Sequence, residues 1–250
     1  CQKTWIYLEP IFTSDDINRQ MPKEGKRFKT VDAYWRRTMN AAKKNSIFID
    51  FFNETERLLE TLIESNKMLA IIGKKLSAYL DSKRMAFPRF FFLSNLELLS
   101  ILSQTKNPLA VQPHLNKCFD AIASLHFNKK GIIDAMSSSD GEIVSLSPTI
   151  DPYHGANAGN VEIWLKEVEL SMKISLHRSA RKALANYHQS TDRNQWILSF
   201  PSQIILAINQ VIWSSDVENA IQKNQLKEYS IQLNKHMMDL VELVRGSLTS

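Results

Sequence analysis

The residue types best suited to metal binding or nucleophilic catalysis are few and dispersed in this chain. Zinc sites use histidine and cysteine ligands at short, regular spacings. Cys118 lies on a predicted helix face next to Phe119, a setting that favours a buried structural thiol over a reactive nucleophile. The six histidines form no His-x-x-x-His pair and no cluster with a cysteine, so the sequence has no zinc-binding pattern. They are His114, His126, His154, His177, His188 and His236.

A phosphate-binding loop is not expected either. Such a loop needs a glycine-rich turn that ends in Gly-Lys-Ser/Thr, so that backbone N–H groups can surround the phosphates. The stretch Gly73-Lys74-Lys75 lies inside a helical pattern and has neither the preceding glycine nor the hydroxyl residue. We interpret it as a helix interior and expect no nucleotide site in the chain.

A run of carboxylates is the remaining feature that could do acid–base chemistry. Glu54, Glu56, Glu60 and Glu64 alternate with leucines, and on an amphipathic helix such residues form the solvated face. Asn53-Glu54-Thr55 matches a glycosylation acceptor, which is idle in a cytosolic protein. The sequence thus predicts no catalytic residue, no cofactor-binding residue and no metal ligand.

The composition indicates a body made of long helices. The chain is 44% apolar but has only 7 glycines and 8 prolines among 250 residues, so turns are few. No apolar run approaches the roughly 20 residues of a membrane span. Two distant cysteines and the lack of a signal-like start indicate a reducing, cytosolic setting. Because the chain begins at Cys1 and in mid-pattern, we expect it to be cut from a longer polypeptide.

The net charge of +5 and the pI of about 9.1 leave nucleic-acid binding open as a rival function. Acidic residues are interleaved almost everywhere, and no aromatic-glycine motif or zinc spacing typical of nucleic-acid-binding domains is present. We interpret the basic residues as solvated helix faces, whereas salt-sensitive binding to DNA or RNA would support the rival. The basic clusters are Lys23, Lys26, Arg27 and Lys29, then Arg36-Arg37, Lys43-Lys44, and Arg178, Arg181 and Lys182.

Apolar residues at steps of three and four predict most of the elements. The longest stripe runs from Leu58 to Tyr79, and Leu59, Ile63, Ala70 and Leu80 widen it, so we expect this helix to pack against at least two neighbours. Gly73 inside this helix could permit close approach of another helix or a bend. A glycine that is merely tolerated in a helix interior is the commoner case. Other helices are expected over residues 1–12, 22–44, 95–104, 108–124 and 161–187, and from Ser14, Pro201 and Leu226.

One region has the pattern of a small sheet. Residues 132–136 and 143–146 flank Asp140-Gly141, a strong hairpin signal. A two-residue turn there places Ser137 opposite Val144 and Ala135 opposite Leu146. Residues 125–127 could add a third strand, and 148–159 reads as a loop.

An aromatic segment follows the longest helix. From Phe87 to Leu93 it carries five large apolar side chains with neither helical nor alternating spacing, so we expect an extended segment buried on both sides, with Phe91 in the core. Arg89 must reach solvent, a carboxylate or helix carbonyls, and a structural tie and an interface contact both stay open. Core packing is favoured over partner contacts for Trp5, Trp35, Trp164, Trp196 and Trp213.

The same segment carries a family resemblance. The stretch Ser82 to Ala86, the aromatic run that follows it, and Leu96 to Ser103 resemble the linker of a dynein heavy chain, closer to the axonemal than to the cytoplasmic branch. The resemblance covers nearly the whole chain and is weakest between Ile150 and Gly159. Further similar stretches occur in the family's order at residues 4–12, 28–35, 111–119, 137–142, 161–165 and 239–245.

This resemblance implies an elongated multi-helix linker, mainly α and rod-like, with one small antiparallel β-hairpin or meander. We expect three subdomains: residues 1–84 ending in the long helix, 85–150 with the hairpin, and 151–250 as a long-helix bundle. Structural or interface roles are expected for Phe87, Pro88, Arg89, Phe90, Phe91 and Trp164, and hinge roles for Gly73, Met85 and Ala86.

The resemblance also implies a mechanical function. The linker is a lever across a ring of ATPase modules, and it bends as nucleotide changes. This segment itself is expected to be non-catalytic, whereas the parent chain hydrolyses ATP and moves on microtubules. Implied partners are the AAA+ ring of the same heavy chain and dynein complex subunits, with the microtubule reached only through the parent chain, in the cytoplasm, cytoskeleton and ciliary axoneme. No nucleic acid or membrane partner is expected. An independent α-helical scaffold or adaptor is the alternative.

Overall fold

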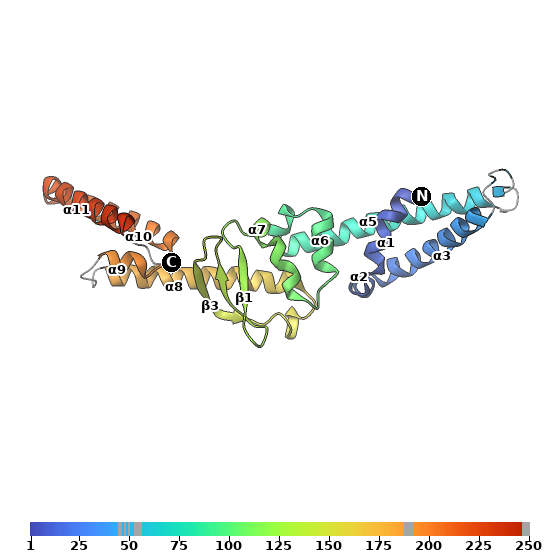
Figure 1. The fold of residues 1–250 in the computed structure, drawn as a ribbon, viewed down its shortest axis with the longest axis horizontal. Helices are drawn as coiled ribbons and strands as arrows, with labels where there is room; N and C mark the ends of the chain where they lie inside the picture. Colours follow the sequence, from blue (N-terminus) through green and yellow to red (C-terminus); the bar gives the residue numbers. More distant parts are fainter. Residues whose placement is uncertain (45–46, 48, 50, 53–56, 188–192, 247–250) are drawn as a thin grey trace.

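The computed structural model describes residues 1–44, 47, 49, 51–52, 57–187 and 193–246. It is an elongated, mainly helical molecule with one small sheet near its middle (Figure 1), so the predicted fold class is confirmed. The stretch Asn53-Glu54-Thr55, which matches a glycosylation acceptor, lies outside the described residues, as do Glu56 and His188.

One end of the molecule is a group of helices packed on the longest one. Pro22 is the first residue of its helix, a position where a missing N–H costs nothing. The rings of Phe12 and Phe28 stack with centroids 5.4 Å apart, and the Trp5 indole donates a hydrogen bond to Asp32 at 3.0 Å. This end comprises α1 (Gln2–Thr13), α2 (Asp15–Gln20), α3 (Pro22–Lys44) and α5 (Leu58–Ala86).

The buried face of α5 is narrower than its sequence predicts. The predicted stripe is largely confirmed, with Leu58, Ser65, Leu69, Ile72 and Leu76 buried. The proposed widening is right at Leu80, which is buried, but wrong at Leu59, Ile63 and Ala70. These three are exposed because α1 and α3 cover only one side of α5. A Cβ at Gly73 would have no atom within 4 Å, so this glycine does not serve close helix approach.

The aromatic segment is helical rather than extended, which corrects the prediction. After α5, Pro88–Phe92 form the 3₁₀ helix η1. With three residues per turn, Phe87, Phe90 and Leu93 lie on one buried face, while Phe91 and Phe92 are 61% and 72% exposed. The apolar residues of this segment are spaced irregularly because a 3₁₀ period is combined with two exposed phenylalanines. The prediction that Phe91 lies in the core is therefore wrong.

The next elements are short. Helix α6 (Asn95–Leu102) begins with a capping box, in which Ser94 and Glu97 satisfy each other's backbone N–H groups. The single helix expected over 108–124 is wrong: η2 (Pro108–His114) and α7 (Leu115–Cys118) take its place. Pro113 lies inside that span and lacks the N–H that a continuous α-helix needs, and Phe119 is extended.

The sheet has three antiparallel strands in the order β1-β2-β3: β1 (Ser124–Phe127), β2 (Ile133–Ser137) and β3 (Ile143–Ile150). The expected third strand is confirmed, but the predicted register is wrong by one position. Ser137 pairs with Ile143 rather than Val144, and Ala135 with Ser145. The loop is longer than two residues: the Ser138 N–H donates to the Glu142 carbonyl at 2.9 Å, and Gly141 adopts φ +85°.

Strand β3 extends into the region expected to be a loop, where it meets α8 (Val161–Tyr187). The Ser147 N–H donates to Ser175 Oγ at 2.9 Å, and Ser171 Oγ donates to the Pro148 carbonyl at 2.5 Å. Proline is tolerated here because β3 is an edge strand of the sheet. The predicted span of α8, residues 161–187, is confirmed.

The far end holds α9 (Arg193–Leu198), α10 (Ser202–Gln222) and α11 (Leu226–Arg245). A second apolar core lies here, around Ala183, Trp196 and Ile208, apart from the first core, which spans Leu8 to Val168. Trp213 is 52% exposed, so its predicted core position is wrong. Helix α9 has no counterpart among the predicted elements. The division into three subdomains stays a prediction.

Candidate functional site: the junction of the two longest helices

The two longest helices, α5 and α8, meet at the middle of the molecule (Figure 1). We call this meeting point the central junction. It consists of Tyr79, Lys83, Phe87, Arg89, Phe90, Cys118, Phe119, Glu162, Trp164 and Glu169. It brings together one end of α5, the segment η1, α7 and the first half of α8.

A buried ion pair connects the two helices directly. Lys83 of α5 donates to Glu162 of α8, and only 13% and 8% of these side chains are exposed. Glu162 lies in the first turn of α8, where the helix dipole favours a negative charge. Its Oε2 has no hydrogen-bond partner in the described structure. Two charges removed from water depend on each other, so losing either one leaves an uncompensated buried charge.

Tyr79 extends this contact toward the first helices. The Lys83 ammonium lies 5.6 Å from the centroid of the Tyr79 ring, a cation–π distance. The Tyr79 hydroxyl donates to the side-chain amide of Gln20, at the end of α2. Burial, with a smaller effect of the nearby Glu162 carboxylate, raises the pKa of the Tyr79 phenol, so it stays a neutral donor.

Arg89 makes a second connection to α8. Its Nη1 donates to the Cys118 carbonyl at 2.9 Å, and its Nε lies 3.6 Å from Glu169 Oε2. The guanidinium also lies 4.7 Å from the centroid of the Phe119 ring. A hydrogen bond from Lys173 is the main cause that lowers the pKa of Glu169, with Arg89 adding to it against the opposing effect of burial. Arg89 was interpreted either as a structural tie or as an interface contact, and these contacts within the chain fit the structural tie.

The apolar part of the junction comes from the inner face of η1. Phe87 and Phe90 contact edge-to-face with centroids 5.0 Å apart, and Phe119 lies 6.1 Å from Phe87. Pro88 begins η1, and Trp164 of α8 is fully buried. Among the aromatic residues predicted for structural or interface roles, Phe87, Phe90 and Trp164 are buried, whereas Phe91 is exposed.

The predicted hinge residues lie on α5. Gly73 is in its interior, Met85 is exposed near its end, and Ala86 is its last residue. Arg84 holds the next segment in place: its Nη2 donates to the Leu93 carbonyl at 3.3 Å and to Asn95 Oδ1 at 2.7 Å. The hinge role of these residues stays a prediction.

Sequence reasoning did not find the charged partners Lys83, Glu162 and Glu169. Lys83 belongs to the stretch Ser82 to Ala86, which resembles the dynein linker, but no local spacing pairs it with a residue on another helix. The one usable signal was a glutamate beside Val161 at the start of an otherwise apolar helix face.

The chemistry available to the described residues is limited. No group of three or more histidines, cysteines and carboxylates within them is placed to hold a metal ion. Burial raises the pKa of the Cys118 thiol to about 11, although Arg89 opposes the shift, so the thiol is protonated at neutral pH and unreactive. In the part of the chain that is described, no helix has the length and apolarity to cross a membrane.

Comparisons with known proteins identify the family. A family model described as "Dynein heavy chain, N-terminal region 2" matches residues 1–183. The chain is 47% identical to dynein axonemal heavy chain 1 of Rattus norvegicus and 44% identical to dynein axonemal heavy chain 3 of Mus musculus, each over 250 residues. It is 46% identical to dynein axonemal heavy chain 12 of Homo sapiens. These alignments cover 99–100% of this chain.

The same alignments cover only 5%, 6% and 8% of the three relatives, so the chain spans a small part of their length. The match extends from α1 into α8 and includes the whole central junction. The predicted resemblance to an axonemal dynein heavy chain is confirmed: the chain belongs to the dynein heavy chain family, and its residues 1–183 correspond to the family's N-terminal region 2.

Proposed function

We propose that this chain is the mechanical linker, or lever, of an axonemal dynein heavy chain. The observation that carries the proposal is the central junction, where the last turn of α5 meets the first turn of α8 through the buried Lys83–Glu162 ion pair, with a second contact from Arg89 of η1 to Glu169 of α8. At 1.5 Å per residue, α5 and α8 are each about 40 Å long. Two stiff segments with one small contact between them suit the transmission of a displacement.

The lever proposal assigns the energy source to other parts of the parent chain. The axonemal relatives support a parent motor that hydrolyses ATP in an AAA+ ring and acts on microtubules in the ciliary axoneme. Under this proposal the ring of the same heavy chain is the direct partner of this segment. Other dynein complex subunits and the microtubule are engaged only through the parent chain.

We further propose that the lever bends close to the central junction. Hinges consist of a few loop or element-terminal residues that absorb the change in backbone angles. Met85 and Ala86 end α5, and Gly73 lacks a side chain about three turns before Lys83 and its ion pair. In this account the Lys83–Glu162 contact stabilises one of the two positions of α5 against α8.

Microtubule gliding by the parent heavy chain tests the proposal. Lys83→Met should slow gliding several-fold while microtubule-stimulated ATP hydrolysis is retained, because the change loosens the force path without touching a nucleotide site. Lys67→Met, at an exposed position of α5, is the matched control and should glide normally. Normal gliding by Lys83→Met would contradict the proposal, as would an equal loss of ATP hydrolysis and gliding.

A further inference from the structure

A cleft lies between strand β3 and the second half of α8, two elements that pack side by side (Figure 1). Its volume is about 320 Å³, within the roughly 300–1,000 Å³ typical of ligand sites. We call it the α8–β3 cleft. Its polar side chains are four serines and two cations: Ser145, Ser147, Ser175, Ser179, Arg178 and Lys182.

The positions of these residues in the two elements bring them together. The four lining residues of α8 follow one another at steps of three and four, so they lie on one face of the helix. Ser145 and Ser147 are two positions apart on β3 and lie on the same side of the strand. Arg178 Nη1 donates to Ser147 Oγ at 2.9 Å, and the Ser147 N–H donates to Ser175 Oγ at 2.9 Å. These bonds hold the two walls of the cleft in contact.

The cleft is positively charged. No Asp or Glu lines it, and neither Arg178 nor Lys182 forms an ion pair with another described residue. From residue 170 to the end of α8 the sequence has four Lys and Arg side chains and no Asp or Glu. Glu142, beside the start of β3, already accepts hydrogen bonds from the N–H and the hydroxyl of Ser202 at 2.8 and 3.0 Å. The cleft therefore favours an anion.

Several donors in the cleft are unused and within reach of a ligand. Among the described residues, the Ser145 and Ser179 hydroxyls and the Lys182 ammonium have no hydrogen-bond partner. Arg178 uses one of its five N–H groups on Ser147. Ser145, Arg178 and Lys182 are exposed, and Ser179 is half-buried. An anion with several oxygens would accept hydrogen bonds from both walls.

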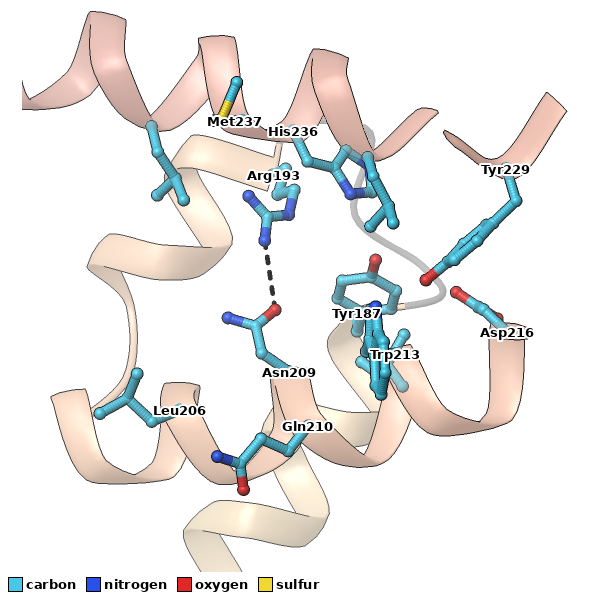
Figure 2. A pocket seen from close by; sticks show the side chains of 13 residues that line it. Tyr187, Arg193, Leu206, Asn209, Gln210, Trp213, Asp216, Tyr229, His236 and Met237 are labelled. Atoms are coloured by element: carbon cyan, nitrogen blue, oxygen red, sulfur yellow. Dashed lines mark hydrogen bonds between the residues drawn. The ribbon is translucent and has the colours of Figure 1, made fainter. Parts of the chain in front are cut away.

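The pocket between α10 and α11, lined by Arg193 and Trp213 among others (Figure 2), lacks these properties. Arg193 donates to Asn209 at 3.2 Å, but its Nε and Nη1 atoms are buried, so a ligand cannot reach them. Asp216 adds a negative charge to the lining of that pocket. The α8–β3 cleft, by contrast, combines accessible cations with a lining free of carboxylates.

We propose that the α8–β3 cleft binds a phosphorylated serine or threonine side chain of a partner protein. Such a side chain carries a charge of about −1.5 to −2 and three strong acceptor oxygens. The N–H groups of Arg178 that Ser147 does not use match two of these oxygens, because a guanidinium pairs with phosphate through parallel hydrogen bonds. Lys182 and the hydroxyls of Ser145 and Ser179 supply further donors.

The rest of the lining favours a phosphorylated protein over free phosphate or a nucleotide. Ile143, which is 68% exposed, and Pro201 line the same cleft, and they would contact the residues that flank the phosphate. Free phosphate has no group that could use this apolar contact. No aromatic side chain lines the cleft, so a nucleobase would have no ring on which to stack. The proposal does not depend on the lever function.

Short synthetic peptides test the proposal with the 250-residue chain. The probe is a fluorescently labelled peptide, Ala-Val-phosphoserine-Ala-Val, and its control has an unmodified serine. In fluorescence anisotropy we expect the phosphopeptide to bind about tenfold or more tightly than the control. Equal affinities would overturn the proposal.

Two competitors distinguish the other sources of phosphate. We expect inorganic phosphate and a single-stranded DNA oligonucleotide to displace the phosphopeptide only at concentrations about tenfold or more above that of the unlabelled phosphopeptide. Displacement by inorganic phosphate at equal concentration would overturn the assignment to a protein and give the cleft to free phosphate. Displacement by the oligonucleotide at equal or lower concentration would give it to nucleic acid.

Variants of the chain assign binding to the cleft. Arg178→Met and Lys182→Met should each weaken phosphopeptide binding about fivefold or more. Arg181→Met is the matched control, because Arg181 is exposed on the same helix, carries the same charge and does not line the cleft. It should change the affinity by about twofold or less. Circular dichroism verifies that each variant is folded. Equal losses in all three variants would show attraction to the general charge of α8 and would overturn the proposal.

Discussion

Lys83 and Glu162 lie 79 positions apart in the sequence and form a buried ion pair between α5 and α8. Each side chain comes from a different long helix, and neither has another charged partner among the described residues. The pair therefore couples the position of one helix to that of the other, and its loss should be felt at the junction first.

Breaking this pair should destabilise the chain. Lys83→Met leaves the Glu162 carboxylate buried without its cation, and we expect a loss of about 3–5 kcal/mol in the free energy of unfolding. The double variant Lys83→Met/Glu162→Met removes both charges and should recover most of that loss. Urea unfolding of the single and double variants measures both values. Additive losses in the double variant would show that the two charges do not depend on each other.

The two faces of η1 should differ sharply in their contribution to stability. Phe90 is buried, so Phe90→Ala should cost about 3–5 kcal/mol. Phe91 is exposed, so Phe91→Ala should change stability by no more than about 0.5 kcal/mol. Thermal or urea unfolding of the two variants decides the matter, and similar losses at both positions would contradict the 3₁₀ geometry.

Acid should weaken the start of α6 through Glu97. A hydrogen bond from Lys117, and then bonds from Ser94, lower the pKa of Glu97 to about 2 from its usual 4.5. A carboxyl whose pKa is lower in the folded state stabilises the fold above its unfolded pKa. This contribution is complete above about pH 4.5 and is lost as pH falls toward 2.

Melting temperatures between pH 7 and pH 2 test this prediction. Glu97→Gln should melt lower at pH 7 and approach the unmodified chain as pH falls. Glu64→Gln, at an exposed position of α5, removes the same charge without disturbing the capping box. An unchanged difference between Glu97→Gln and the unmodified chain across this pH range would show that the Glu97 charge does not stabilise the helix.

The isolated chain should neither bind nor hydrolyse ATP. Its Gly73-Lys74-Lys75 stretch is part of α5, so its backbone N–H groups are committed to the helix and cannot surround a phosphate. A ligand stabilises only a protein that binds it, so Mg-ATP should leave the melting temperature unchanged. A saturable shift at physiological ATP concentration would refute this.

Long periodic patterns predicted the helices well, because a stripe of apolar residues specifies a helix over many turns. The spans 22–44 and 161–187 are confirmed for this reason. Short elements were harder. The five residues of the 3₁₀ helix Pro88–Phe92 make fewer than two turns, which is too few to reveal a period, and the exposed Phe91 and Phe92 concealed it. Similarly, one extra residue in the loop at Gly141 shifted the register of β2 against β3.

The central junction was predicted only in part. Its aromatic residues stood out because they are large and adjacent in sequence, and the family resemblance pointed to the same segment. The ion pairs of Lys83 and Arg89 with α8 could not be foreseen, because they depend on how two helices far apart in sequence are placed. The pocket lined by Arg193 and Trp213 was missed for the same reason, since α9 supplies Arg193 and was itself not predicted.

The distance between the two ends of the lever tests the central claim most directly. Fluorophores placed at the exposed Lys29 on α3 and Lys182 on α8 would report it by energy transfer in the parent heavy chain. A second pair at Lys29 and Lys67 lies within one end and serves as the control. The account predicts that the first distance changes between the ATP-bound and nucleotide-free states while the second stays constant. An unchanged Lys29–Lys182 distance in both states would contradict the lever.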